Sequence, residues 1–216
     1  MADEKIIEIV KKVRDSAGER KFKQSFDLCV NFKLLDVKKP EGKIKKDITL
    51  PHGTGKEHFI GAIVDTLVPK VNELKNEKVI LIKKDEIAAL GKDKKKAKKL
   101  ANKCRVFLAE APLMPAVAKA LGPILAPRGK MPKPIPPTIP NLAPLVAANM
   151  KVTHVSVKGS PVIHCGVGSE TLDDQKIAEN IEAVINSLST VLPRGKDNIR
   201  DLYLKMTMSK GIKFKV

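Results

Sequence analysis

The sequence predicts two domains of mixed architecture: an α+β domain built from both ends of the chain, and an α/β domain inserted into it. Alternating strands and amphipathic helices occur near both termini, whereas the middle of the 216-residue chain alternates short apolar runs with helical segments. Apolar strands separated by helices are typical of parallel βαβ units. We therefore expect the α+β domain over residues 1–66 and 153–216, and the α/β domain over residues 67–152.

The first part of the terminal domain is predicted to be a helix followed by two strands. Residues 3–17 carry apolar side chains at helical spacing, and Gly18 is well placed to end the helix. From Phe26 to Leu34 every second side chain is apolar, which indicates a strand with one buried face. After a lysine-rich connection, residues 43–50 predict a second strand that ends at Pro51.

The middle of the chain predicts strands and helices in alternation. Its apolar runs lie at 58–64, 79–82 and 105–108, and the helical segments that follow them lie at 68–77, 85–103 and 113–122. A proline belt comes next, with eight of the chain's 15 prolines between Pro123 and Pro144. A short helix around residues 142–150 is expected to close this region.

The last part of the chain returns to the pattern of the first. From residue 152, VTHVSVKGSPVIHCGVG predicts two alternating strands joined by the turn KGSP. Residues 173–191 predict an amphipathic helix, opened by a capping box from Thr171 to Asp174. The final segments LYLKMTMS and IKFKV are both typical of strands.

The charge of the chain indicates a polyanionic partner. The formal net charge is +17, and residues 67–152 hold 18 Lys+Arg against 6 Asp+Glu, which places most of the excess in the insert. Nucleic acid is favoured over a membrane, because no basic helix carries the apolar face that interfacial anchoring needs. Seven lysines crowd residues 92–103. Such a run is either a phosphate contact or a solvated helix face, and a run without defined geometry favours the second.

The termini and cysteines indicate a cytoplasmic protein. The segment MADEKIIEIVKKV lacks the apolar core of a signal peptide, and no run is long enough to cross a membrane. Cys29, Cys104 and Cys165 are far apart and in no CxxC spacing, which suits reduced thiols. An aromatic content of 3% disfavours a surface that stacks unpaired bases.

No catalytic or cofactor motif stands out, so we expect no enzyme, metal or cofactor. The segment HGTGK at 52–56 lacks the first glycine and the Ser or Thr of a phosphate-binding loop, which favours a tight turn. His164 and Cys165 are adjacent on a strand and point to opposite faces, so they cannot form a catalytic pair. His154 on the neighbouring strand could approach His164, but two histidines without a third ligand make a poor metal site.

Five segments and the final helix resemble the ribosomal protein L-one family, the lateral-stalk proteins of the large ribosomal subunit. The segments are LGPILAPRGKMPKP at 121–134, KFKQSFDLCVNFKLLDVKKP, LPHGTGK, IHCGVG and LYLKMTMS, and their residues resemble those of the archaeal members. The resemblance covers nearly the whole chain. It implies a Rossmann-like inserted domain that binds no nucleotide, and the absence of GxGxxG after a strand agrees with that. It also implies binding to large-subunit rRNA, a role in release of exit-site tRNA, repression by binding of the protein's own mRNA, and a monomer within the ribosome.

The family's main RNA surface implies a site on the terminal domain. Carried over by motif, its candidates are Phe22, Ser25, Asp27, Thr207 and Met208, together with Ser209 and Gly211 in the segment that follows. Hydroxyls and backbone groups suit a structured RNA, because they read 2′-hydroxyl and phosphate positions across a shallow groove, and the Asp27 carboxylate can accept a hydrogen bond from a 2′-hydroxyl. Two structural alternatives stay open: Phe22 as part of a core, and Asp27 as a cross-strand ion-pair partner.

Two segments qualify the resemblance. Family members usually have TMG where this chain has Ser209, followed by Lys210 and Gly211, so a side chain stands where the backbone would approach RNA. In the proline belt, the prolines fix an irregular, stiff path after a helix that ends near Leu121. Arg128, Lys130 and Lys133 would then be a secondary RNA contact, although scaffolding is the favoured role of the belt.

Two other functions compete with RNA binding. One is an enzyme that uses the α/β domain on an anionic substrate, which needs a clustered acid, base or phosphate loop. The other is a generic basic scaffold that binds acidic proteins.

Overall fold

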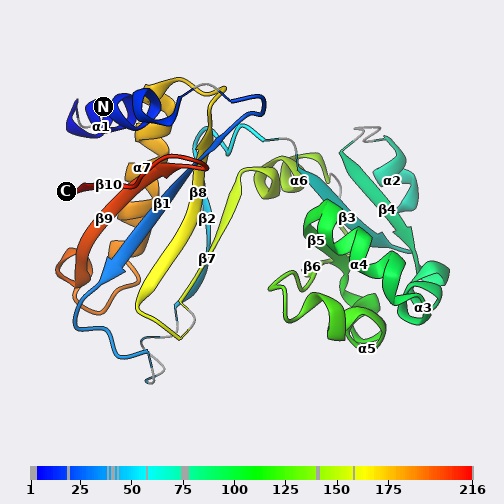
Figure 1. Cartoon of the computed structure of the whole chain (residues 1–216). Coiled ribbons are helices and arrows are strands. Elements are labelled where there is room, and N and C mark those ends of the chain that lie inside the picture. Colours follow the sequence, from blue (N-terminus) through cyan, green and yellow to red (C-terminus); the bar gives the residue numbers. More distant parts are fainter. Residues whose placement is uncertain are drawn as a thin grey trace. The chain divides into compact units, whose positions relative to one another are not determined.

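A computed structural model describes residues 4–18, 20–37, 39, 42, 44–56, 58–73, 78–139, 142–157 and 159–215. The chain folds as two compact units, Met1–Lys56 with Lys151–Val216, and Glu57–Met150 (Figure 1). It mixes helices with sheets, as the sequence predicted. None of the helices in the described ranges has the length and apolar character that a membrane crossing requires.

The first unit combines a four-stranded antiparallel sheet, ordered β10-β9-β1-β8, with a separate pair, β2-β7. Its elements are α1 (Glu4–Ala17), β1 (Ser25–Phe32), β2 (Lys45–Thr49), β7 (Val152–Ser156), β8 (Val162–Ser169), α7 (Asp174–Ser189), the 3-10 turn η3 (Gly195–Asn198), β9 (Ile199–Met206) and β10 (Ile212–Phe214). The helices and strands predicted in both terminal segments are therefore confirmed in type.

The core of this unit lies between the sheet and the two helices α1 and α7. Buried and half-buried residues alternate along β1, and the buried set packs with the apolar faces of α1 and α7. The other face of β1 carries Ser25, Asp27, Cys29 and Asn31, all half-buried. Because the strand has a period of two, the buried face fixes which side chains this open face presents.

The turn HGTGK at residues 52–56, which follows β2, is held by a buried amide. Asn180 of α7 donates to the carbonyl oxygens of Gly53 and Val167, both at 2.8 Å, and accepts from the backbone N–H of His52 at 3.1 Å. Gly53 and Gly55 both have positive φ. A Cβ on Gly55 would lie 2.3 Å from Ser169 Oγ, so glycine is required there by space as well as by conformation. The predicted tight turn is confirmed.

Three local predictions in this unit are wrong. Leu34 lies beyond β1 with φ 57° and is 73% exposed, because the chain leaves the strand after Phe32. The residue that caps α7 is Asp173, and Thr171 instead shares a hydrogen bond with Ser169.

The third wrong prediction concerns His154 and His164. Their strands were expected to pair, but β7 pairs with β2 and β8 pairs with β1. His154 accordingly contacts Asp47 at 2.7 Å, and His164 contacts Cys29 at 3.1 Å. Strands β7 and β8 therefore belong to different sheets and form no hairpin, and Lys158 of the predicted turn KGSP lies outside the described residues.

The second unit is a parallel sheet ordered β4-β3-β5-β6 with a hydrophobic cluster on each face. Its elements are β3 (Phe59–Val64), α2 (Val68–Glu73), β4 (Val79–Lys83), α3 (Lys84–Lys92), α4 (Lys94–Lys103), β5 (Cys104–Glu110), the 3-10 turn η2 (Ala111–Leu113), α5 (Met114–Leu125), β6 (Lys133–Ile135) and α6 (Ala143–Met150). The predicted parallel arrangement is confirmed. Of the helix predicted over 68–77, residues 74–77 lie outside the described part.

Two helix predictions in this unit need correction. The segment 85–103 is two helices, because the Asp93 carboxylate caps a new helix by accepting from the backbone N–H groups of Lys95 and Lys96. Helix α5 does not end near Leu121 but at Leu125, with Pro123 inside its last turn. Buried Leu121 and Leu125 anchor that turn, while the proline costs only one backbone hydrogen bond near the helix end.

The unit boundaries change the distribution of charge. The second unit begins before β3, which was predicted to lie in the terminal domain, and it ends at Met150. These bounds add Glu57 and Asp65 to the unit and remove Lys151 from it. Residues 57–150 then carry a net charge of +9, and the rest of the chain carries +8. With these bounds the net charge is divided almost equally, so it does not by itself single out either unit.

Candidate nucleic-acid interface

The candidate residues of the first unit gather at one end of its four-stranded sheet. Ser25 begins β1, and Thr207 directly follows β9. The backbone N–H of Ser25 donates to Thr207 Oγ1 at 3.1 Å, and the two hydroxyl oxygens are also 3.1 Å apart. Both groups lie at the surface, so the fold presents a pair of hydroxyls from opposite ends of the chain.

Gln24, which the sequence analysis did not single out, holds this end together. Its side chain accepts from the backbone N–H of Met208 at 3.2 Å and donates to the Gly18 carbonyl at 3.3 Å. Its backbone exchanges two hydrogen bonds of 3.0 Å with Glu170, and the residue is fully buried. Nothing in the pattern KFKQS marks this glutamine as buried, because burial here depends on segments distant in sequence.

Two large apolar side chains are exposed beside this cluster. Phe22 is 49% exposed and Met208 is 58% exposed. Phe22 therefore does not belong to the core, which removes one of the two structural alternatives. We call Phe22, Ser25, Asp27, Thr207, Met208, Ser209 and Gly211 the sheet-end cluster.

Asp27 is a half-buried carboxylate without an ion pair among the described residues. Lys205 is its register partner on β9, but their charged groups do not come within ion-pair distance, so the second structural alternative is not found. Burial raises the pKa of Asp27, against the attraction of Lys56, Lys205 and His164. A carboxylate in this setting carries a desolvation cost that the attraction of these three groups offsets only in part.

Asp27 borders a hollow on the open face of the sheet. Its other linings are Cys29, His164, Cys165, Gly166 and Lys205. Burial raises the pKa of the Cys29 thiol, which disfavours the nucleophilic thiolate. The Cys165 thiol is buried on the core side, where burial raises its pKa to about 12. The prediction that His164 and Cys165 face opposite sides is thus confirmed.

Ser209 turns its side chain inward. Its hydroxyl accepts from the backbone N–H of Met206 at 2.8 Å and donates toward the Lys210 carbonyl at 3.2 Å. Its φ is not positive, so the turn does not demand glycine at this position. A Cβ on Gly211 would meet Tyr203 only at ordinary contact distance, 3.9 Å. The side chain at 209 thus closes the turn between β9 and β10 and leaves the outer surface clear.

The basic residues of the proline belt are turned toward their own unit. Lys130 Nζ donates to the carbonyls of Ala101 and Cys104 at 2.7 and 2.8 Å, at the end of α4. Lys133 Nζ donates to Asn149 Oδ1 at 3.1 Å, and Arg128 donates to Asn102 Oδ1. Burial lowers the pKa of Lys130. Of the three, only Arg128 is exposed.

The lysine run at 92–103 lies on α3 and α4. Along α4, only Ala97 and Ala101 are buried, and most of the lysines face solvent. Lys103 places its ammonium 4.6 Å from the centre of the Phe59 ring. In the described part of the chain, no three His, Cys, Asp or Glu side chains are arranged to hold a metal ion.

Comparison with known proteins decides the family. Residues 10–210 match the ribosomal protein L1p/L10e family. The chain belongs to this family. It is 40% identical over 210 residues to the large ribosomal subunit protein uL1 of Thermococcus kodakarensis, covering 97% of this chain and 96% of the relative. It is 41% identical over 211 residues to the protein of that name from Methanothermobacter thermautotrophicus, with coverage of 97% and 98%.

A third relative matches the full chain: the large ribosomal subunit protein uL1 of Methanocaldococcus jannaschii is 39% identical over 216 residues. The resemblance drawn from the sequence segments is therefore confirmed. The family is one of structural ribosomal proteins, so the prediction that the chain is not an enzyme is confirmed as well, together with its place in the cytoplasmic ribosome.

Proposed function

We propose that this ribosomal protein binds large-subunit rRNA at the lateral stalk through the sheet-end cluster. The cluster combines two surface hydroxyls, an exposed aromatic ring, an exposed methionine and an unpaired carboxylate. Such a set suits the wide, shallow groove of structured RNA, where 2′-hydroxyls donate and accept hydrogen bonds. Exposed Phe22 and Met208 offer apolar surface to an unstacked base or a sugar.

The observation that carries this proposal is the unpaired Asp27 carboxylate. A half-buried charge without a partner is unfavourable for the folded chain, and it lies on the open face beside the hydroxyl pair. A 2′-hydroxyl donor would satisfy it, whereas a phosphate would be repelled by it. The arrangement therefore favours recognition of RNA by shape over general attraction to a polyanion.

The finer functions follow from the same surface. We propose that the cluster also binds a stalk-like site in the protein's own mRNA and represses its translation. We propose that the two compact units are the two domains predicted from the sequence: the α+β domain built from both ends of the chain and the inserted α/β domain. A role in release of exit-site tRNA and a monomeric state within the ribosome belong to the same proposal.

The proline belt is proposed to act first as a scaffold. Lys130 and Lys133 are bonded within their own unit, so any secondary RNA contact falls mainly to Arg128. The lysines of 92–103 then assist through general electrostatic attraction.

The test is the affinity of the full chain for a stalk fragment of large-subunit rRNA in a filter-binding assay. Phe22→Ala and Thr207→Val should each weaken binding about tenfold or more, a loss of roughly 1.4 kcal/mol. The matched controls are Leu34→Ala, which also truncates an exposed apolar side chain, and Thr190→Val, which also removes an exposed hydroxyl. Unchanged affinity for both cluster variants would contradict the proposal.

The dependence of this affinity on salt gives a second readout. If few phosphates are contacted, the slope of log K against log salt should be modest. A steep slope that disappears when Lys98 and Lys99 are replaced by Ala would move the main site to the second unit.

A further inference from the structure

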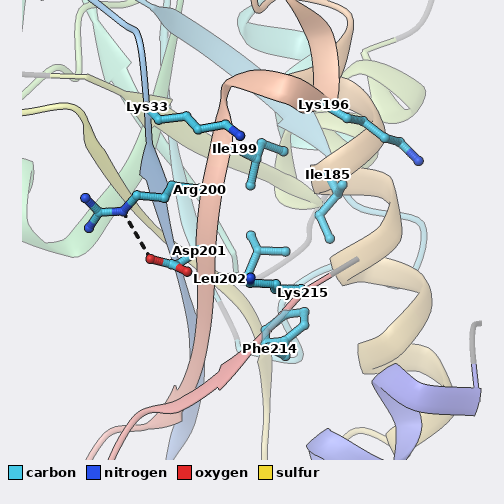
Figure 2. Close-up of a pocket in the computed structure, with 9 residues that line it drawn as sticks. All are labelled: Lys33, Ile185, Lys196, Ile199, Arg200, Asp201, Leu202, Phe214 and Lys215. Atoms are coloured by element: carbon cyan, nitrogen blue, oxygen red, sulfur yellow. Dashed lines mark hydrogen bonds and ion pairs between the residues drawn. The ribbon is translucent and has the colours of Figure 1, made fainter.

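A second site lies in the first unit, apart from the sheet-end cluster. Figure 2 shows a pocket whose lining comes from β9, β10, α7, η3 and the residue after β1. Its volume is about 200 Å³, and it is lined by Lys33, Ile185, Lys196, Ile199, Arg200, Asp201, Leu202, Phe214 and Lys215. We call it the β9–α7 pocket. It lies near the Phe32 end of β1, whereas the sheet-end cluster lies at the Ser25 end.

The floor of the pocket is apolar. Ile185 comes from α7, Ile199 and Leu202 from β9, and Phe214 from β10. Phe214 is only 6% exposed, so its ring is a wall and offers no stacking platform. An apolar ligand group would bury its surface here, at about 25 cal/mol per Å² removed from water.

The rim of the pocket is cationic and largely unengaged. Within the described residues, no ion pair or hydrogen bond occupies the side-chain nitrogens of Lys33, Lys196 and Lys215. Asp201, the one acidic lining residue, already accepts from Arg200 Nε at 3.1 Å and from Lys213 Nζ at 2.8 Å. The remaining N–H groups of Arg200 face no acceptor in the described chain.

Size and chemistry together select the ligand. The pocket is smaller than the roughly 300–1,000 Å³ of sites for drug-sized molecules, so it suits one side chain better than a nucleotide. A phosphodiester backbone has no apolar group to fill the floor, and no exposed aromatic ring is present to stack a base. A peptide with one apolar side chain between acidic residues matches both the floor and the rim.

We propose that the β9–α7 pocket docks an acidic peptide segment of a partner protein, with an apolar side chain seated on Leu202 and Phe214. The flanking carboxylates then pair with Lys33, Lys196, Arg200 and Lys215. This interaction goes beyond the proposed binding of rRNA and uses a different part of the same unit, so both ligands can bind at once.

The probe is a fluorescein-labelled peptide with Leu-Phe at its centre and Asp and Glu on both sides, followed by fluorescence anisotropy with the full chain. Saturable binding is expected. Joint replacement of Lys33, Lys196 and Lys215 by Ala should weaken it at least tenfold. The matched control replaces Lys5, Lys11 and Lys45 by Ala, which removes the same charge from exposed positions of the same unit. The control should change the affinity less than threefold.

Further measurements test whether an apolar side chain anchors the peptide and whether the pocket binds RNA instead. A peptide with Ser-Ser in place of Leu-Phe should bind at least tenfold more weakly, and Ile199→Phe, which narrows the pocket from a half-buried position, should also weaken binding. The pocket variants should keep the thermal midpoint within a few degrees and bind the stalk RNA with unchanged affinity.

Several outcomes would overturn the proposal. Equal weakening by both lysine triples would mean attraction to a chain of charge +17, with no defined site. Equal binding of the Ser-Ser peptide would show that no apolar side chain anchors the peptide in the pocket. Displacement of the peptide by a short single-stranded RNA, in a manner that depends on the pocket lysines, would assign the pocket to nucleic acid. Stalk RNA binding that fails in the wild type while the peptide still binds would reject only the proposed rRNA site.

Discussion

The sheet-end cluster and the proline belt were both assigned to RNA from the same family resemblance, yet their side chains are placed differently. In the cluster, Phe22 and Met208 are exposed, and Asp27 makes no ion pair or side-chain hydrogen bond within the described chain. In the belt, the ammonium groups of Lys130 and Lys133 donate hydrogen bonds to groups of their own unit. The cluster carries little charge, whereas the belt is basic.

The difference teaches that basic sequence is a weak guide to a nucleic-acid surface. Lys130 lies where the last carbonyls of α4 would otherwise lack donors, and a cation at a helix C-terminus is also favoured by the helix dipole. The charge of Lys130 therefore interacts with groups of its own unit. Polar groups that remain unsatisfied are a better guide, because their cost is offset only when a ligand binds.

The largest expected effect comes from replacement of Gln24, the buried residue that holds the sheet-end cluster in place. Gln24→Leu removes the acceptor of the Met208 N–H and the donor to the Gly18 carbonyl, which should lower the free energy of unfolding by about 3 kcal/mol. The turn after β9 should loosen with it, and stalk RNA affinity should fall about tenfold. Urea denaturation and filter binding measure the two effects. Gln175→Leu, at an exposed position of α7, is the control and should change neither quantity appreciably.

The next effect separates stability from binding in the belt. Lys130→Met keeps the aliphatic length but removes two charge-assisted hydrogen bonds, so the free energy of unfolding should fall by about 2 kcal/mol. RNA affinity should change less than twofold. Lys119→Met, on the exposed face of α5, loses the same charge and should leave stability unaltered. If Lys130→Met weakened RNA binding without loss of stability, the belt would be an interface and not a scaffold.

The sequence predicted element types well because periodicity reports local burial. The alternation in β1 and the apolar runs of β3, β4 and β5 gave strands of the right kind, and HGTGK gave a turn. The predictions were wrong where the structure depends on contacts between residues that are distant in the sequence. The pairing of β7 with β2, and not with β8, depends on strands about a hundred residues apart.

The site was predicted only as far as the resemblance reached. Motif matching named Ser25 and Thr207, which the fold brings into contact, although their role in binding stays a prediction. Gln24 was missed because an amide in KFKQS looks solvated until Gly18 and Met208 enclose it. The β9–α7 pocket was missed because its cations come from four separate segments, and none of them forms a charge run.

A smaller effect tests the unpaired carboxylate. Because burial raises the pKa of Asp27, the folded chain binds its proton more tightly than the unfolded chain does. Its contribution to stability is therefore lost as pH rises from the ordinary value of 3.8 through the folded pKa, and it stays lost at neutral pH. Asp27→Asn should raise the free energy of unfolding at pH 7 by less than about 1 kcal/mol, and the gain should vanish near pH 3.5.

The same variant should bind RNA about threefold more weakly, since an amide oxygen accepts less strongly than a carboxylate. A loss of RNA affinity would indicate a specific contact of Asp27, because removal of a negative charge by itself raises the general electrostatic attraction to RNA. Asp15→Asn, on an exposed face of α1, controls for that attraction and should bind RNA equally or slightly more tightly. A stability gain that is constant with pH would show that the Asp27 charge is not its cause.

The smallest effect concerns Ser209, which stands where the sequence resemblance leads us to expect a glycine. Ser209→Gly removes the acceptor of the Met206 N–H and adds freedom to the unfolded chain, so the free energy of unfolding should fall by about 1 kcal/mol. RNA affinity should stay within twofold, because the hydroxyl already points into the turn and clears the outer surface. Ser209→Ala separates the two contributions, since it loses the hydrogen bond but keeps the backbone restriction. A tenfold tighter complex with Gly alone would mean that RNA approaches the backbone at 209 more closely than the serine allows, and the cluster would then extend through this turn.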